Sequence, residues 1–432
     1  PDWVAHRLWI GTLLFVAGLG MRWMTRVLGF APLAALVAAL VYQLSPYILP
    51  YISRTSVLLL PYAGLGWIVG CTVLASLRGR WRYPATIALI VLTVGAVNAT
   101  ALAMVIPAPV LWLVHAAWGG TITWRRAAAT AAKTGVLCLG VSLWWITMLV
   151  VQGRHGADVL AYSESLEAVS LTSTSTEVTR GLGYWLFYVR DAYAPTTTAS
   201  IDHLVSGRTV ALGYLVLAAG LAGIVFGRWQ HRRFVALLFG AGIILGVGVH
   251  PIDDSSPVMS LLVGDGEGGL ALALRSSTRA VPVLLLGLGL GAALIVARLG
   301  TMSVPHVQPR VLRVAAAATI GLVAIAALPA LRNGGFVDPA LERDQDPPDA
   351  WLEAAADLDA RTDGYRVLQV PGTEFGAFQW GYTVDQPLPA LSERALVTRD
   401  LLPLGSPAAM DLLFALDDRI QADTIEPAAV AG

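Results

Sequence analysis

Charged side chains are scarce in this sequence, and the scarcity is concentrated before Leu331. Only 13% of the 432 residues are charged, 56% are hydrophobic, and Lys133 is the one lysine among 29 basic residues. Soluble globular proteins carry about 25% charged residues, so the composition excludes an ordinary soluble protein for this part of the chain. The net charge of zero and the lack of a basic run exclude nucleic acid as a partner.

Cysteine and membrane-buried charge are also rare. The two cysteines, Cys71 and Cys138, both fall within apolar segments, where a small buried side chain is expected rather than a disulfide or a metal site. The ionisable residues His115 and Lys133 lie near the ends of apolar segments. Proton-coupled transporters place ionisable groups at mid-membrane. The absence of such groups from the middle of the apolar segments therefore disfavours a transport function.

Long apolar runs dominate what is present. About 20 apolar residues span a bilayer, and about ten segments are predicted to do so, near 8–21, 28–42, 56–77, 84–98, 100–118, 131–151, 209–226, 234–249, 280–297 and 311–331. Several are short, and those within 28–42 and 84–118 can be kinked or re-entrant. The expected fold class is mainly α: a polytopic transmembrane helical bundle over 1–331, followed by the start of a soluble α/β domain over 332–432.

The loops between these segments separate charge by sign. One set carries only basic residues: Arg22, Arg26, Arg78, Arg80, Arg82, Arg125, Arg126, Lys133, Arg228, Arg232, Arg233, Arg298, Arg310 and Arg313. The other set carries every acid before Leu331: Asp2, Asp158, Glu164, Glu167, Glu177, Asp191, Asp202, Asp253, Asp254, Asp265 and Glu267. Positive charge favours the cytoplasm. We therefore expect a multi-pass plasma-membrane protein with loops 152–208 and 250–279, and the tail, on the outer face.

Ten crossings would place Pro1 outside, yet the sequence starts with neither an initiator Met nor a signal peptide. We therefore expect at least one further helix and an outer loop before Pro1 in the parent protein. The last residues, near 428–432, show no terminal strand or helix signal. We expect the parent protein to continue beyond them.

The longest outer loop gathers ionisable and aromatic residues. It contains, in order, Arg154, His155, Asp158, Tyr162, Glu164 and Glu167. Further along, Glu177 and Arg180 are three residues apart, which places them on one helix face, and Thr174 or Ser175 can cap that helix. The aromatic run Tyr184, Trp185, Phe187 and Tyr188 is at a depth typical of an interfacial belt.

Two interpretations of this loop stay open from the residues alone. Glu177 and Arg180 can form a solvated salt pair beside aromatic anchors. Alternatively, Glu177 binds a divalent cation or orients an acceptor hydroxyl at the water–lipid boundary, while an arginine takes a lipid phosphate. Arg54, Arg275 and Arg279, near helix starts on the same side, either extend to the headgroups or bind phosphate.

The tail has the pattern of a soluble α/β region. Asp349 is placed to cap a short helix that contains Trp351, and Arg366–Val370 indicates a strand. Ser406 and Pro407 suit the cap and first position of a helix. No nucleophile motif, glycine-rich phosphate loop or metal spacing occurs in the tail.

Several segments resemble a known family. Val370–Leu391 (VPGTEFGAFQWGYTVDQPLPAL), followed by Arg399–Asp400, is similar to the extracellular region of actinobacterial alpha-(1→3)-arabinofuranosyltransferases of cell-wall arabinan synthesis. In chain order, the supporting segments are Arg54–Gly64 (RTSVLLLPYAG), Val97–Ala101 (VNATA), Leu143–Tyr162 (LWWITMLVVQGRHGADVLAY) and Thr174–Trp185 (TSTEVTRGLGYW). The resemblance covers nearly the whole chain.

The resemblance implies a GT-C glycosyltransferase fold. Its expected donor is decaprenylphosphoryl arabinose, its acceptor is arabinan of arabinogalactan or lipoarabinomannan on the outer face, and its surroundings are membrane lipids. The first-loop acid of such enzymes, often with a divalent cation (Mg, Mn or Ca), would lie before Pro1. Glu177 is expected to be a second active-site carboxylate and metal ligand. The residues expected to bind donor phosphate or substrate are Arg180, Arg154, Arg54, Arg275, Glu164 and Tyr184.

Three functions are therefore compared. The transferase is favoured by the clustered outer carboxylates and the resemblance. The alternatives are a catalytically silent membrane scaffold with a carbohydrate-binding extracellular region, and a lipid-linked sugar transporter. Because the first-loop acid is expected upstream of Pro1, this chain alone is predicted to be inactive.

Overall fold

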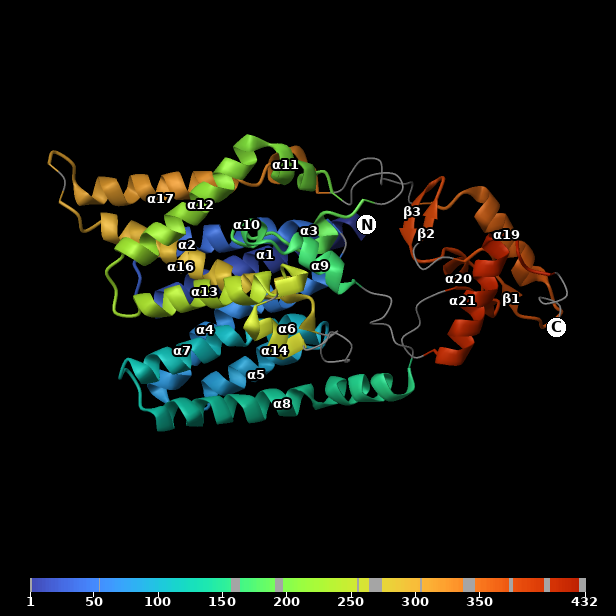
Figure 1. Ribbon diagram of the computed structural model, residues 1–432, viewed down its shortest axis with the longest axis horizontal. Helices are drawn as coiled ribbons and strands as arrows, with labels where there is room; N and C mark the ends of the chain where they lie inside the picture. The colour runs from blue at the N-terminus through green and yellow to red at the C-terminus, as the bar shows by residue number, and fades with distance from the viewer. Residues whose placement is uncertain are drawn as a thin grey trace. The chain divides into compact units, whose positions relative to one another are not determined.

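The computed structural model describes residues 2–53, 55–156, 164–190, 197–254, 256–263, 274–303, 305–336, 346–372, 376–399 and 405–426. Contacts divide the chain into two compact units (Figure 1). The helical unit comprises Pro1–Trp144 and Glu164–Val337, and the C-terminal unit comprises Trp145–Ser163 and Asp338–Gly432. The domain boundary expected at residue 331 stays a prediction.

Long apolar helices build the helical unit. They are α1 (Asp2–Val27), α2 (Pro32–Gln43), α4 (Leu59–Arg78), α5 (Arg82–Val94), α7 (Pro107–Trp118), α8 (Trp124–His155), α12 (Gly207–Phe226), α13 (Arg232–Val247), α16 (Val281–Leu299) and α17 (Pro309–Ala326). Among the described residues, eight helical stretches are long and apolar enough to cross a membrane. All ten predicted crossings coincide with a helix, but α5 and α13 extend only about 20 and 24 Å, less than the roughly 30 Å of a bilayer core.

Short helices connect or extend the long ones. They are η1 (Pro46–Ile48), α3 (Leu49–Ser53), η2 (Ser56–Leu58), α6 (Ala99–Val105), α9 (Leu166–Thr172), α10 (Ser175–Val178), η3 (Trp185–Phe187), α11 (Ala199–Val205), η4 (Ile252–Asp254), α14 (Pro257–Val263), η5 (Ser277–Ala280) and α18 (Ala330–Asn333). Pro46 and Pro107 mark the interruptions after α2 and α6. Proline removes a helical hydrogen bond, so Pro107 divides the predicted crossing 100–118 into α6 and α7. The predicted crossing 28–42 contains the unbroken α2, and Pro46 lies beyond it.

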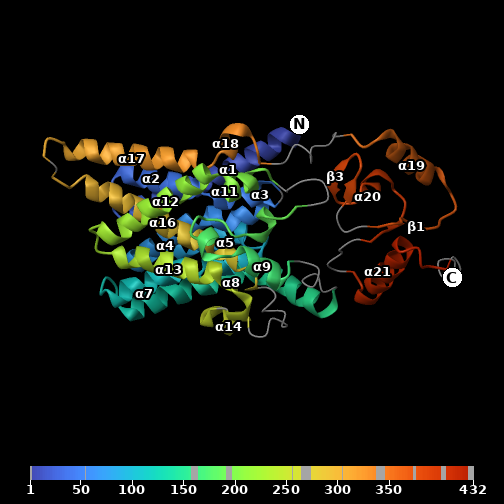
Figure 2. The ribbon, with the colours of Figure 1, turned by 45° about the horizontal axis from the view of Figure 1, so that its top comes forward.

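Helix α16 forms the centre of the helical unit. It packs against α2, α12, α13 and α17, as Figures 1 and 2 show, and almost every residue from Val281 to Leu294 is buried. Glycines allow α12 to approach it closely: a Cβ placed on Gly223 would lie 1.7 Å from the carbonyl oxygen of Gly291. Small residues at such crossings are typical of membrane bundles.

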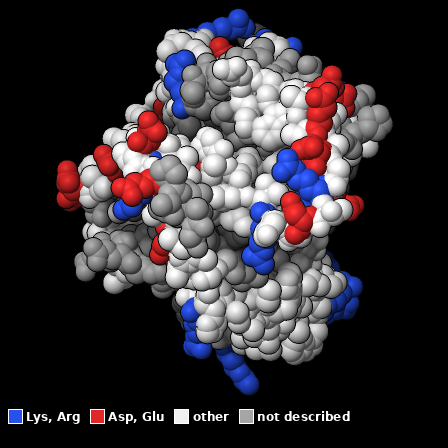
Figure 3. Space-filling model, turned by 90° about the vertical axis from the view of Figure 1, so that its right-hand side faces the viewer, with Lys and Arg blue, Asp and Glu red and all other residues white. Residues whose placement is uncertain are grey.

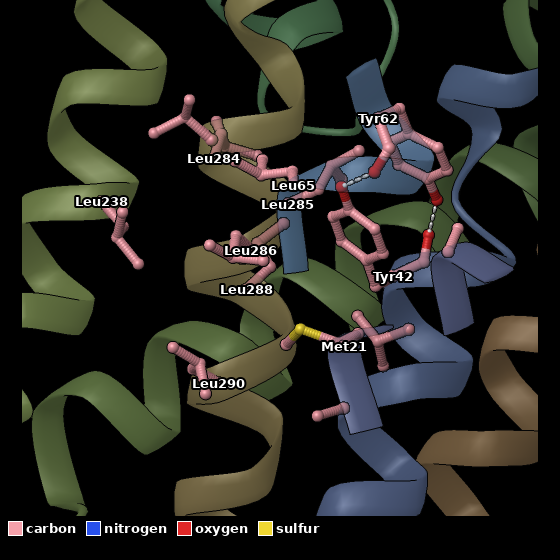
Figure 4. Close-up of a cluster of buried hydrophobic side chains, with 14 of the residues drawn as sticks. Met21, Tyr42, Tyr62, Leu65, Leu238, Leu284, Leu285, Leu286, Leu288 and Leu290 are labelled. Carbon is pink, nitrogen blue, oxygen red and sulfur yellow. Dashed lines mark hydrogen bonds between the residues drawn. The ribbon is translucent and has the colours of Figure 1, made fainter. Parts of the chain in front are cut away.

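A pair of tyrosines ties α2 to α4 inside this core (Figure 4). The rings of Tyr42 and Tyr62 stack with centroids 4.4 Å apart. The Tyr42 hydroxyl donates to the Tyr62 carbonyl at 2.8 Å, and the Tyr62 hydroxyl donates to the Tyr42 carbonyl. Each buried hydroxyl therefore has a backbone acceptor, which removes the cost of placing it among leucines.

Helix α8 is the least buried of the long helices. Of its most apolar stretch, only 6% is buried. It packs through Cys138 and Val141 against a small cluster that includes Cys71 and Ile87. Both cysteines are free thiols, as predicted for small apolar side chains.

Successive long helices run in alternating directions (Figures 1 and 2), which gives the helical unit two ends. We call one the loop end; its described residues lie in 44–53, 55–58, 95–98, 164–190, 197–206, 248–254, 256–263, 274–280 and 327–336. We call the other the arginine end; its described residues lie in 28–31, 78–84, 119–133, 227–233, 298–303 and 305–313. The charge separation read from the sequence is thus a separation between the two ends.

The C-terminal unit is a small α/β assembly. Helices α19 (Asp349–Ala360), α20 (Leu388–Leu391) and α21 (Pro407–Gln421) accompany strands β1 (Val367–Leu368), β2 (Gly376–Phe378), β3 (Gly381–Val384) and β4 (Leu396–Val397). β1 pairs in parallel with β4, and β2 forms an antiparallel hairpin with β3. Of the strand predicted at 366–370, only Val367–Leu368 forms one. The predicted cap Asp349 is wrong by one position, because Pro348 is the cap residue.

Ion pairs join several elements of this unit. The described pairs are Arg361 with Asp357, Arg394 with Asp363, and Arg399 with Asp417 and Asp418. Figure 3 shows acidic and basic side chains interspersed on one face of the chain. The mixture differs from the arginine end, where one sign prevails.

Candidate functional site

Two clusters of polar side chains stand out among the described residues of the loop end, the first around Glu177. Helix α10 begins at Ser175 because the Thr174 side chain caps it, accepting from the Glu177 amide at 3.3 Å. The carboxylate of Glu177 pairs with Arg180 through Oε1 and accepts from the Tyr188 hydroxyl through Oε2 at 2.6 Å. The predicted cap and ion pair are therefore confirmed, but the pair is largely buried, with side chains 15% and 5% exposed.

Arg180 is fully engaged with the protein. Besides pairing with Glu177, its Nε donates to the Thr176 carbonyl at 3.3 Å and its Nη1 to the His203 carbonyl at 3.1 Å. The cavity that it lines, with Ser45 among the other lining residues, has a volume of about 20 Å³. That is room for a water molecule and too little for a donor phosphate. The contacts instead join α10 to α11.

Burial controls the titration of two groups around this cluster. Burial lowers the pKa of His203 to about 4, and the positive charge of Arg180 acts in the same direction. Burial also raises the pKa of the Tyr188 hydroxyl, and the negative charge of Glu177 raises it further. At neutral pH, His203 is therefore uncharged, and Tyr188 keeps the proton that it donates to Glu177.

The second cluster joins three segments far apart in the chain. Glu164 accepts from the Trp185 indole through Oε2 at 2.6 Å, and its Oε1 lies 3.8 Å from Nη2 of Arg279. Arg279 also donates to Oδ1 of Asn98 at 3.0 Å. Among the described residues, Oε1 of Glu164 is the one carboxylate oxygen of the two clusters that makes no hydrogen bond.

The aromatic run 184–188 is partly buried in the protein. Tyr184 is 6% exposed and Phe187 is 1% exposed, and the Tyr184 ring stacks on Tyr51 with centroids 4.8 Å apart. Buried rings such as Tyr184 and Phe187 do not fit a belt that faces lipid, whereas the interfacial depth of the half-buried Trp185 and Tyr188 stays a prediction. Burial raises the pKa of the Tyr184 hydroxyl, and the nearby charge of Arg279 opposes that rise.

An apolar groove opens beside the second cluster. It lies between α6–α7 and α13, has a volume of about 430 Å³, and is lined by Ala103, Met104, Ile106, Pro107, Val110, Leu111, Ala241, Leu245 and Leu274. Leu245 and Leu274 also pack, with Trp185, against the buried side chains of Val169 and Met259. Asn98 caps α6, which forms one wall of the groove. The groove and the Glu164–Arg279 cluster therefore share neighbouring residues.

The other predicted site residues are placed less fully. Arg275 is 3% exposed in the segment that leads into η5, and it follows Leu274 of the groove directly. Arg154 is exposed in the last turn of α8, within the C-terminal unit. Arg54 lies outside the described residues.

The described residues do not fit a divalent cation at Glu177. No group of three or more His, Cys, Asp or Glu side chains in the described part of the chain is arranged to hold a metal ion. Both oxygens of Glu177 already have a donor, and one of these is a positively charged arginine. A cation there would face the charge of Arg180. The divalent cation itself stays a prediction.

Several contributors to the two clusters were not predicted from the sequence. Asn98 matches a glycosylation sequon by its sequence, yet it caps α6 and accepts from Arg279. Trp185 and Tyr188 were expected in the aromatic belt, yet each donates to a carboxylate. His203 carried no signal. The one available signal was the residue type, since the polar group of a buried Tyr or Trp usually needs a hydrogen-bond partner.

Comparisons with known proteins agree with this architecture. A family model described as "Alpha-(1->3)-arabinofuranosyltransferase, N-terminal GT-C domain" matches residues 1–431. The alpha-(1→3)-arabinofuranosyltransferase of Mycolicibacterium smegmatis is 31% identical over 436 residues, covering 96% of this chain and 29% of that protein. Its counterpart from Mycobacterium tuberculosis is 32% identical over 448 residues, covering 96% and 30%.

A solved structure has the same fold. The single-particle cryo-EM structure of arabinofuranosyltransferase AftD from mycobacteria has a TM-score of 0.68 and 25% identity, covering 96% of this chain and 27% of that one. The chain thus spans under a third of the length of these relatives. Its apolar helices and its match make it a multi-pass membrane protein of GT-C fold. The chain belongs to the alpha-(1→3)-arabinofuranosyltransferase family, matching its N-terminal GT-C domain.

Proposed function

We propose that the protein transfers arabinofuranose from a decaprenyl-phosphate donor to cell-wall arabinan on the outer face of the plasma membrane. The observation that carries the proposal is the Glu164–Arg279 cluster beside an apolar groove. A charged cluster beside an apolar groove suits a donor with one charged end and a long hydrophobic tail. Membership of the family supports arabinofuranose as the sugar.

In this proposal, the lipid tail lies in the groove between α6–α7 and α13. Arg279, whose guanidinium is held by Asn98, and Arg275, next to Leu274 of the groove, face the donor phosphate. Guanidinium groups suit phosphate because their donors match its oxygens. The donor's head would then lie next to Oε1 of Glu164, 3.8 Å from Arg279.

The reaction would be a single displacement. The acceptor hydroxyl oxygen forms a bond to the anomeric carbon of arabinofuranose, and the bond from that carbon to the phosphate oxygen breaks. The hydroxyl proton passes to the carboxylate of Glu164, which acts as general base. The arginines stabilise the negative charge on the departing decaprenyl phosphate.

Glu177 has a different role in this proposal. Its oxygens already accept from Arg180 and Tyr188, and the Tyr188 hydroxyl also accepts from the Gly183 amide at 3.2 Å. Glu177 therefore holds in place the loop that carries Tyr184 and Trp185. Because the Trp185 indole donates to Glu164, this loop in turn positions the Glu164 carboxylate. We assign Glu177 the role of a positioning residue rather than that of the general base or a metal ligand.

The outer-face orientation rests on charge. The charged residues of the arginine end are all basic, and loops rich in basic residues favour the cytoplasm. The loop end, with both clusters, would then face outwards, together with the C-terminal domain. There a membrane-bound donor and a water-soluble polysaccharide can meet.

The test uses the full-length parent protein. Arabinose transfer from a synthetic polyprenyl-phosphate donor to an arabinan acceptor is measured for wild type, Glu164→Gln and Glu177→Gln. Glu167→Gln is the matched control, since Glu167 is exposed on α9. Glu164→Gln is expected to lower kcat by about 100-fold or more while donor binding is kept.

Other outcomes discriminate between roles and functions. Full activity of Glu164→Gln with loss in Glu177→Gln, at unchanged stability, would return the catalytic role to Glu177. No transfer by a folded wild-type parent, together with arabinan binding, would favour the silent scaffold. Movement of the intact donor across a vesicle membrane without transfer would favour the transporter.

A further inference from the structure

A small hollow at the arginine end is lined by three cations. The turn between α4 and α5 meets α8 there, and the lining includes Arg80, Arg126 and Lys133, with Gly79 and Thr130 between them. The cavity has a volume of about 50 Å³. Its cations come from two segments of the chain, so the fold, and not a run in the sequence, brings them together.

Nothing in the described part of the chain neutralises these charges. No described ion pair includes Arg80, Arg126 or Lys133, and the sequence has no Asp or Glu between Asp2 and Asp158. Arg126 donates to the Leu77 carbonyl, which fixes its head beside the hollow. Three like charges held together without an acid form a site for an anion.

Lys133 lies within an apolar stretch of α8, where a charged side chain is energetically unfavourable. It is the single lysine of the sequence, and it lies nine residues after Trp124, the first residue of α8, about 13 Å along that helix. Its ammonium lies over the ring of Trp81, 4.8 Å from the centroid, so its side chain reaches back to the arginine end. A charge placed within an apolar span is costly and commonly functional.

Exposed tryptophans mark the membrane boundary around this hollow. Trp81 and Trp124 are each 58% exposed, and Trp118 is 82% exposed. Tryptophan concentrates where headgroups meet acyl chains. Beyond Lys133, α8 exposes Val136, Leu139 and Leu143, an apolar surface along which an acyl chain can lie.

We propose that this cationic hollow binds the headgroup phosphate of an anionic glycerophospholipid in the leaflet at the arginine end. The surrounding tryptophans and the apolar face of α8 favour a lipid phosphate over a soluble one. Basic pockets between membrane helices are suited to such headgroups. The site lies at the opposite end of the helical unit from the Glu164 cluster, so the proposal does not depend on transfer activity.

The test titrates the full-length protein in detergent with dioleoylphosphatidylglycerol, and with dioleoylphosphatidylcholine as the zwitterionic reference, using native mass spectrometry. The double variant Arg80→Gln/Lys133→Gln removes two cations of the hollow. The matched control Arg228→Gln/Arg310→Gln removes two exposed arginines of the same end that lie outside it. We expect the first variant to bind phosphatidylglycerol about 30-fold more weakly, since each cation contributes about 5-fold, and the control to bind like wild type.

A second measurement needs no substitution. Phosphatidylglycerol, but not phosphatidylcholine, should slow acetylation of Lys133 by an N-hydroxysuccinimide ester, read by peptide mass spectrometry. Equal binding by the double variant and wild type, or equal acetylation with both lipids, would overturn the proposal. Displacement of the lipid by millimolar inorganic phosphate would show that the hollow takes a soluble anion instead, and would also overturn it.

Discussion

Removing either partner of the Glu177–Arg180 pair should destabilise the helical unit more than a surface pair would. Arg180→Gln leaves the carboxylate of Glu177, only 15% exposed, with Tyr188 as its remaining donor. Breaking a buried pair typically costs about 3–5 kcal/mol. Because Glu177 keeps some contact with water, we expect the lower end, about 3 kcal/mol.

Glu177→Gln should cost less. Arg180 would keep its bonds to the carbonyls of Thr176 and His203, so its charge stays partly compensated, and the loss should be about 2 kcal/mol. In the double variant Glu177→Gln/Arg180→Gln, no buried charge is left. Its cost should therefore fall below the sum of the single costs, with a coupling free energy of about 2 kcal/mol.

The assay is unfolding of the full-length protein by SDS titration in mixed micelles, followed by tryptophan fluorescence for all four proteins. The exposed pair Arg361 and Asp357, truncated in the same way, provides the comparison, with an expected coupling of about 0.5 kcal/mol or less. A coupling of that small size at Glu177–Arg180 would refute the buried-pair reasoning. It would mean that solvent, or a substrate group, satisfies these charges in the protein.

Three further predictions address packing, pH and metal. Gly223→Ala should destabilise the protein by about 1–3 kcal/mol, because the added Cβ would lie 1.7 Å from the Gly291 carbonyl oxygen. Gly240→Ala is the control and should leave stability unchanged, since no atom lies within 4 Å of its Cβ. Thermal unfolding of the two variants measures the difference. Since burial lowers the pKa of His203 to about 4, the unfolded chain binds a proton between about pH 6.5 and 4 that the folded chain does not. Stability should therefore fall on acidification through that window, by about 3 kcal/mol, and a pH series of His203→Leu should show a smaller fall. If the divalent cation expected from the family is present, EDTA should abolish arabinose transfer, and added Mg²⁺, Mn²⁺ or Ca²⁺ should restore it. The Glu177→Gln variant should need the same metal concentration as wild type. A changed metal affinity in that variant would make Glu177 a ligand.

Hydrophobic length and local spacing predicted much of this fold. Each of the ten expected crossings coincides with a helix, because about 20 apolar residues have few other stable arrangements in a chain so poor in charge. The spacing also predicts the pair of Glu177 and Arg180, because residues three apart on a helix are neighbours. Both inferences depend only on residues that are close in sequence.

The remaining features depend on contacts between distant segments. Glu164, Asn98 and Arg279 meet only once the helices have packed, and no spacing in the sequence connects them. The aromatic run was misplaced for a related reason. Lipid tails are as apolar as leucine, so hydropathy does not separate a ring that faces lipid from one such as Tyr184 that stacks on Tyr51.

The central position of α16 has a consequence for biosynthesis. This helix begins at Val281, so the ribosome makes it after α2, α12 and α13, three of the helices against which it later packs. Until it enters the membrane, the surfaces of α2 and α13 that it will cover must face lipid or each other. The helical unit therefore cannot close before α16 is inserted, and α17, which packs against α2, α12 and α16, is added only after it.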